Sequence, residues 1–97
     1  MAFGRYQRAA ELKYVPSYVY LGRMYLSGQG VAADSKRAVA LFKDAARAND
    51  SAAMFILGEL YEAGQGVDRN EAIAKEYYKL AAERGSEDAK KKLAALN

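Results

Sequence analysis

The sequence has neither cysteine nor histidine among its 97 residues. Without cysteine the chain cannot form disulfides, a thiol nucleophile or a thiolate metal site. Without histidine it also lacks imidazole ligands and the side chain that most often serves as a general base near neutral pH. We therefore expect no metal, no cofactor and no enzymatic activity. The redox compartment stays open, because a chain without cysteine is suited to oxidising and reducing environments alike.

Long apolar runs are also missing. Hydrophobic residues make up 52% of the chain, yet no run approaches the roughly 20 residues that span a membrane. The first eight residues are too polar for the core of a signal peptide. We expect a soluble protein without membrane insertion, cytoplasmic or, if the chain is a fragment of a longer protein, periplasmic or secretory.

Charge of one sign is not concentrated anywhere. The net charge is +3, with residues 1–50 carrying eight basic and four acidic residues, and residues 51–97 seven and eight. Acidic side chains are interleaved with the basic ones, whereas phosphate binding needs several cations on one face. We therefore interpret the run Lys90-Lys91-Lys92 as a solubilising helix surface and expect no nucleic-acid partner.

What the sequence does contain is an internal repeat. The stretch 21–31 returns at 57–67 with an offset of 36 residues, a period typical of solenoid proteins. Tyr6, Phe42 and Tyr78 align at the same offset, and a pair of alanines follows each of them three residues later. The recurring structural positions are Leu21, Gly22, Tyr25, Gly28 and Gly30 in the first copy and Leu57, Gly58, Tyr61, Gly64 and Gly66 in the second.

Apolar residues recur at helical spacing throughout, and no window alternates as a strand does. We predict a repeating unit of two helices, with a half unit at 1–14, full units at 15–50 and 51–86, and a capping helix at 87–97. The predicted helices are 2–13, 16–28, from after Asp34 to 48, 51–63, from after Asn70 to 84, and from after Ser86 onward. Asp34, Asn70 and either Asp50 or Ser51 are the expected N-caps.

The glycines in the repeat are expected to have different roles. Gly22 and Gly58 lie inside helices, where glycine costs about 1 kcal/mol relative to alanine. We expect them to admit a neighbouring helix, with the alanine pairs as the contacting residues. The Gly-Gln-Gly stretches suit a left-handed helix end and a turn. They do not suit a phosphate loop, which needs a preceding strand and a following Gly-Lys-Ser/Thr.

The two signatures are Ala-x3-Leu-Gly-x2-Tyr-x2-Gly-x-Gly-Val and Ala-x3-aromatic-x2-Ala-Ala. Together they resemble the Sel1-like repeat, a relative of the tetratricopeptide repeat. The resemblance implies an all-α, right-handed superhelical solenoid of helix-turn-helix units. Ser17 departs from the pattern, which has alanine there. Some cysteine-rich members of that family are associated with β-lactams, but this chain has neither their cysteines nor a Ser-x-x-Lys motif.

By the same resemblance, the first helix of each unit lines a concave face that holds a partner segment. The expected partner-binding residues are Val19, Tyr20, Arg23, Leu26, Phe55, Glu59, Glu62 and Lys91, with Ala95 at the matching position of the last helix. Glu59 and Glu62 lie one turn apart, and we interpret them as charges lining this groove and not as an acid–base pair. Tyr20 suits either an interface or packing under a neighbouring helix.

Two functions remain open from the sequence. The first is a non-catalytic protein-interaction or scaffold module that binds a protein or peptide on the concave face, with a floor suited to a segment carrying both charges. The alternative is a structural repeat that self-associates into a homo-oligomer through its ends or its groove. The identity of the partner is not encoded in any motif of the chain.

Overall fold

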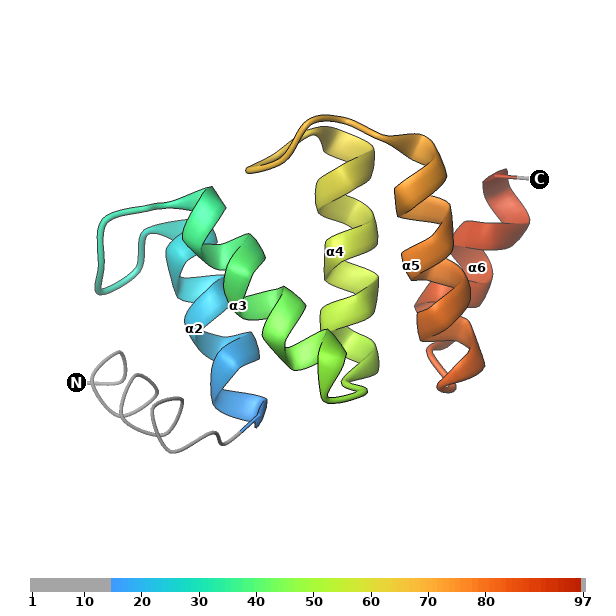
Figure 1. Ribbon diagram of the computed structural model, residues 1–97, viewed down its shortest axis with the longest axis horizontal. Helices are drawn as coiled ribbons and strands as arrows, with labels where there is room; N and C mark the ends of the chain where they lie inside the picture. The colour runs from blue at the N-terminus through green and yellow to red at the C-terminus, as the bar shows by residue number, and fades with distance from the viewer. Residues whose placement is uncertain (1–14, 97) are drawn as a thin grey trace.

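The computed structural model describes residues 15–96, and within them the chain consists of helices joined by short loops (Figure 1). These helices are α2 (Val15–Ser27), α3 (Ser35–Arg47), α4 (Ser51–Ala63), α5 (Glu71–Glu83) and α6 (Glu87–Leu96). They lie side by side in the order of the sequence, and the described residues include no strand. The all-α class is confirmed. The helix predicted for residues 2–13 lies outside the described part.

Polar side chains begin the helices where the sequence indicates. Asp34 accepts a hydrogen bond from the Arg37 backbone N–H at 3.1 Å, and Asn70 accepts one from the Ile73 N–H at 3.0 Å. At α4 the cap is Asp50, whose carboxylate accepts from the Ala53 N–H at 3.0 Å. Each bond satisfies a backbone donor that has no partner within its own helix.

Residues with positive φ end the helices. Gly28 and Gly64 have φ of 74° and 72°, so both adopt the left-handed conformation predicted for them. At the turn after α3 the residue with positive φ is Asn49, at 69°. The equivalent residue after α5 is Gly85, at 95°. Asn49 also accepts a hydrogen bond from the Arg84 guanidinium at 2.8 Å, which ties this corner to the end of α5.

The glycines inside α2 and α4 accommodate aromatic rings. A Cβ added to Gly22 would lie 2.7 Å from the Phe42 ring, and one added to Gly58 would lie 2.5 Å from the Tyr78 ring. Both rings are fully buried. A neighbouring helix does approach at each glycine, as expected, but the nearest contact is an aromatic ring and not the alanine pair that follows it. A ring this close to the helix backbone needs a position without a Cβ.

The core runs along the seam between successive helices. A larger cluster joins α2, α3 and α4, and a smaller one joins α4, α5 and α6. Val31 and Val67, from the two long turns, pack against the larger cluster. Ser17 is buried at 2% exposure at the opening of α2. The resulting body is elongated, measuring 42 × 24 × 17 Å along its principal axes.

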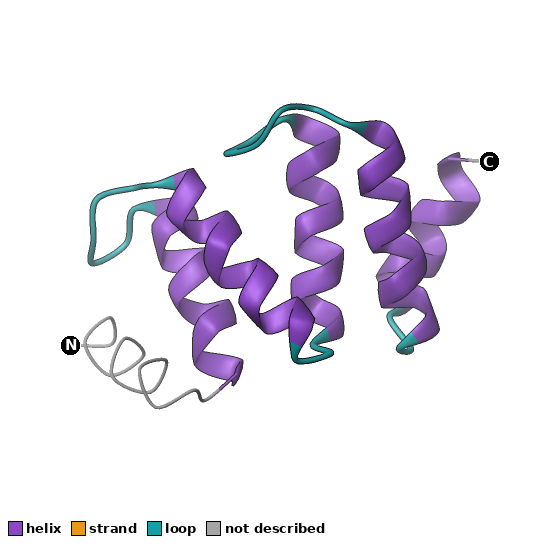
Figure 2. Cartoon of the chain, in the orientation of Figure 1, coloured by secondary structure: helices purple, strands orange, loops and turns teal. Residues whose placement is uncertain are grey.

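The second long turn holds the two units together. In Figure 2 the loop after α4 extends toward the start of α3. There a Cβ added to Gly66 would lie 2.6 Å from the backbone oxygen of Ser35. The Gln65 side-chain amide lies 3.5 Å from the Ser35 hydroxyl. This turn thus serves as a contact surface between units as well as a corner.

Candidate functional site

A hollow of about 370 Å³ lies where α2, α4 and the start of α6 meet. Its lining combines apolar, cationic and anionic side chains from three helices, namely Arg23, Ser51, Ala52, Phe55, Ile56, Glu59, Ser86, Glu87 and Asp88. A second hollow, of about 210 Å³, adjoins it and is lined by Val19, Tyr20, Arg23, Asp50 and Ala52. Because the two share Arg23 and Ala52, we treat them as one trough, called here the α2–α4–α6 trough.

The floor of the trough is apolar and anchored in the core. Phe55 is half-buried and packs against the smaller core cluster, with its ring centroid 5.7 Å from that of Tyr78. Ile56 is also half-buried and packs against the larger cluster. Tyr20, at the narrow end, is 50% exposed. A contacting molecule would therefore meet a rigid apolar surface with a polar border.

Carboxylates outnumber cations along the trough. Glu59 has its pKa raised above the ordinary value, chiefly because burial disfavours the charged carboxylate. The negative charges of Glu62 and Asp88 raise that pKa further, whereas the positive charges of Lys92 and Arg23 lower it. The site thus presents an exposed carboxylate with a raised pKa in the same hollow as the aromatic ring of Phe55.

The structure brings several of the predicted partner-binding residues together and separates others. Arg23, Phe55 and Glu59 line the larger hollow, and Val19 and Tyr20 line the smaller one. Val19 is only 7% exposed and belongs mainly to the core. Sequence reasoning missed the contribution of residues 86–88. The repeat could have indicated them, because they stand 36 positions after residues 50–52, which also line the trough.

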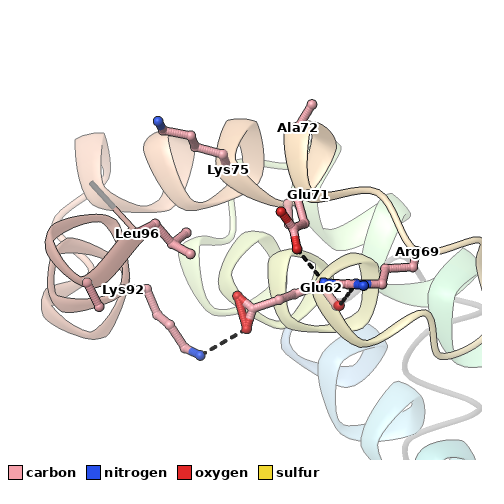
Figure 3. Close-up of a pocket in the computed structure, with 9 residues that line it drawn as sticks. Glu62, Arg69, Glu71, Ala72, Lys75, Lys92 and Leu96 are labelled. Carbon is pink, nitrogen blue, oxygen red and sulfur yellow. Dashed lines mark hydrogen bonds and ion pairs between the residues drawn. The ribbon is translucent and has the colours of Figure 1, made fainter.

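The remaining predicted residues lie elsewhere. Leu26 is half-buried against the larger core cluster, and Lys91 is exposed and lines neither part of the trough. Glu62 lines a different hollow of about 540 Å³ near the end of α6, as does Ala95 (Figure 3). Glu62 accepts hydrogen bonds there from the Lys92 ammonium and the Tyr78 hydroxyl, both at 3.2 Å.

Figure 3 shows Glu62 as a junction between elements. Its two carboxylate oxygens reach α5 and α6, and its backbone oxygen accepts from the Arg69 guanidinium at 3.2 Å. Arg69 in turn pairs with Glu71. Burial and the charge of Glu62 both raise the pKa of the Tyr78 hydroxyl. These contacts connect three helices of the fold, so Glu62 has a structural role in the monomer.

Residues 15–96 contain no cluster of three or more acidic, histidine or cysteine side chains arranged to hold a metal ion. Across the same residues, no helix combines the length and the apolar character of a membrane span.

Comparison with protein families gives matches to the Sel1 repeat over residues 15–50 and 51–86. The chain belongs to the Sel1-repeat family. Proteins of the Sel1-repeat family are generally protein-interaction scaffolds and are typically not enzymes. Among curated proteins, no significant match to this Sel1-repeat chain was found.

Solved structures of Sel1-repeat proteins share the fold. A Sel1 repeat protein from Oxalobacter formigenes is 38% identical with a TM-score of 0.89, and the alignment covers 93% of this chain and 68% of that one. Helicobacter pylori cysteine rich protein B is 34% identical with a TM-score of 0.84, over 90% of this chain and 65% of that one.

A protective antigen of uropathogenic Escherichia coli strains is 37% identical with a TM-score of 0.84, over 87% of this chain and 18% of that one. The chain thus spans about two thirds of the first two proteins and a much smaller share of the third. These similarities confirm an all-α Sel1-repeat solenoid.

Proposed function

We propose that the chain is a non-catalytic protein-interaction module that holds a segment of a partner protein in the α2–α4–α6 trough. The observation that carries this proposal is the continuity of the trough across three helices, with Phe55 half-buried at its floor and charged side chains at its border. Interfaces between proteins commonly have an aromatic anchor at the centre and a polar rim. The general behaviour of the family agrees with such a role.

The open form of the trough favours a polypeptide over a small molecule. Small-molecule sites enclose most of the ligand surface, whereas this trough is shallow and lined along its length by separate helices. Tyr20 in the smaller hollow, Arg23 where the two hollows join, and Glu87 and Asp88 in the larger hollow are all exposed. An extended or helical segment lying across α2, α4 and α6 would contact both hollows at once.

The test compares two double variants in partner capture by crosslinking. Arg23→Glu with Phe55→Ala alters the trough, and we expect it to abolish capture. Arg47→Glu with Leu80→Ala makes matched substitutions in the separate hollow between α3 and α5, and capture should persist. Circular dichroism melts of both variants verify that they are folded. Equal capture by the trough variant and the wild type would remove this surface from consideration.

The alternative function is self-association as a structural repeat. It is favoured by apolar side chains that remain exposed on the last two helices, with Leu80 41% and Leu96 47% exposed. Light scattering across a concentration series distinguishes the two functions. A mass that stays at one chain up to high concentration argues against assembly, and a rise that Leu80→Glu abolishes supports it.

A further inference from the structure

The charges along the α2–α4–α6 trough are not balanced within the protein. Its lining includes the carboxylates of Glu59, Glu87 and Asp88, with Asp50 at the narrow end, and Arg23 is the cation that lines it among residues 15–96. This local excess is opposite in sign to the chain as a whole, whose net charge is +3. The trough therefore differs from the average surface of the molecule.

Two of these carboxylates already have a partner inside the chain. Asp50 caps α4 through the Ala53 backbone N–H at 3.0 Å. Glu87 accepts from the Lys90 ammonium at 3.2 Å. By contrast, Glu59 and Asp88 form no ion pair with any other residue in the described part of the chain. They are the two acidic groups of the trough whose capacity to accept hydrogen bonds is still available.

The environment of Glu59 makes a cation especially favourable there. Glu59 is an exposed residue, yet desolvation by its surroundings raises the pKa of its carboxyl. The charges of Glu62 and Asp88 also raise this pKa, whereas those of Lys92 and Arg23 lower it. A cationic group placed beside Glu59 and Asp88 would relieve the repulsion between their charges. Charge-assisted hydrogen bonds of this kind are about twice as strong as neutral ones.

The apolar floor indicates which cation fits. Phe55 and Ile56 line the same hollow as Glu59 and Asp88. Arginine and lysine carry long aliphatic stems that cover apolar surface while the charged head stays near polar groups. A guanidinium also stacks favourably on aromatic rings. A cation without such a stem would leave the floor uncovered.

We propose that the partner segment is basic, and that one arginine or lysine side chain lies along Phe55 with its charged head between Glu59 and Asp88. This inference rests on the proposed function and specifies the chemistry of the partner at the same site. Arg23, at the other end of the hollow, disfavours a second cation next to it. The recognised segment therefore carries its basic residue toward the α6 end of the trough and a neutral or acidic residue toward α2.

Selection from a random peptide library displayed on phage tests the inference on the whole chain. The wild type should enrich peptides that combine arginine or lysine with apolar residues. Because the net charge of the chain is positive, bulk electrostatics would select against such peptides, so enrichment reports the local site. Glu59→Gln with Asp88→Asn should remove this enrichment.

The matched control is Glu76→Gln with Glu83→Gln on α5, which changes the net charge equally but leaves the trough intact. It should select the same basic peptides as the wild type. A synthetic peptide from the selected pool should bind the trough variant about tenfold more weakly than the control, the loss expected for a charge-assisted contact. Amide chemical-shift changes should concentrate at residues 52–59 and 86–88.

Three results would overturn the inference. They are enrichment of acidic or uncharged peptides, equal basic enrichment on the trough variant and the control, and the absence of any enriched peptide. The crosslinking capture experiment described above tests the proposed function separately from this inference. If Arg23→Glu with Phe55→Ala abolishes partner capture while the library shows no basic preference, the trough is an interface and only the basic character of its partner is wrong.

Discussion

In both full repeat units an aromatic ring packs over a glycine inside the first helix, but the two rings differ. In the first, Phe42 lies over Gly22, and in the second, Tyr78 lies over Gly58. The ring of Tyr78 carries a hydroxyl that donates to Glu62, which also pairs with Lys92 of α6. Phe42 has no such group. The glycine slot therefore requires an aromatic ring in both units, while the polar link to the next helix belongs to the second unit alone.

The long turns show a second difference between the units. Gly28 to Gly30 in the first turn are exposed, whereas Gly66 in the second is half-buried against the start of α3. Both turns have the same positive φ at their second glycine, 73° at Gly30 and 76° at Gly66. The backbone shape is thus a property of the repeat, and at Gly66 the contact with Ser35 adds a constraint to that shape.

The largest expected effect comes from the second turn. Gly66→Ala should destabilise the fold by roughly 2–3 kcal/mol, because a left-handed alanine costs about 1–2 kcal/mol and its Cβ would strike the Ser35 carbonyl. Gly28→Ala is the control, because its Cβ would lie no closer than 3.4 Å to Ala33. It should cost only the conformational part, about 1–2 kcal/mol. Urea denaturation of both variants measures the difference. Equal losses would mean that the Gly66 contact adds nothing to stability.

The glycine slots should be the next most sensitive positions. Overpacking of a core costs about 1–3 kcal/mol, partly offset by about 1 kcal/mol of improved helix propensity. We expect Gly58→Ala to lose about 1–2 kcal/mol net, since its Cβ would lie 2.5 Å from Tyr78. Thermal denaturation of Gly58→Ala alone and in a Tyr78→Leu background tests the cause. The same loss in both backgrounds would show that the ring is not what excludes the Cβ.

A smaller effect separates Tyr78 from Phe42. Tyr78→Phe removes the hydrogen bond to Glu62 and should cost about 1 kcal/mol near neutral pH. Burial raises the pKa of Tyr78 in the folded chain above its unfolded value of about 10. Above that pH the unfolded chain releases a proton that the folded chain retains, so stability falls as the pH rises.

Comparing the stability of the wild type and Tyr78→Phe between neutral pH and pH about 11 isolates this contribution, because the other tyrosines are common to both proteins. The wild type should lose more stability over the range. Parallel pH profiles would show that Tyr78 titrates alike in the folded and unfolded chains.

The smallest effect concerns the corner that the units build differently. Asn49→Gly copies the second unit, where Gly85 occupies the corner. It relieves a positive φ but removes the hydrogen bond from Arg84, so the two changes should nearly cancel, to within about 0.5 kcal/mol. Asn49→Ala removes the bond without relieving φ and should cost about 1–2 kcal/mol. Chemical denaturation measures the free energy of unfolding of both variants. A greater loss of stability in Asn49→Gly than in Asn49→Ala would contradict this prediction.

The helices, their caps and their corners were predictable because they depend on local chemistry. Asp34 and Asn70 act within their own first turns, and Gly28 and Gly64 act through their own backbone angles. Each of these signals also occurs twice, 36 residues apart, which strengthened the prediction. The family resemblance followed from the same positions and was confirmed by the match over both units.

The trough was harder to predict because it depends on how separate helices approach one another. Helical register places Leu26 two turns from Val19, but only packing decided that Leu26 lies against the core. Register also suggested Lys91 for the last helix, whereas the lysine that reaches Glu62 is Lys92. At the repeat offset of 36, residues 86–88 correspond to residues 50–52, which also line the trough. The offset was therefore a signal for them, but only packing shows that α6 begins beside α4.

The sequence by itself determined a two-helix unit of 36 residues, its glycine corners and its polar caps, because each of these is settled by residues close together along the chain. Only the tertiary structure decided that rings fill the glycine slots, that the second turn rests on Ser35, and that Glu59 and Asp88 share one trough. These facts depend on distances between helices, which are set by the volumes of side chains far apart in sequence.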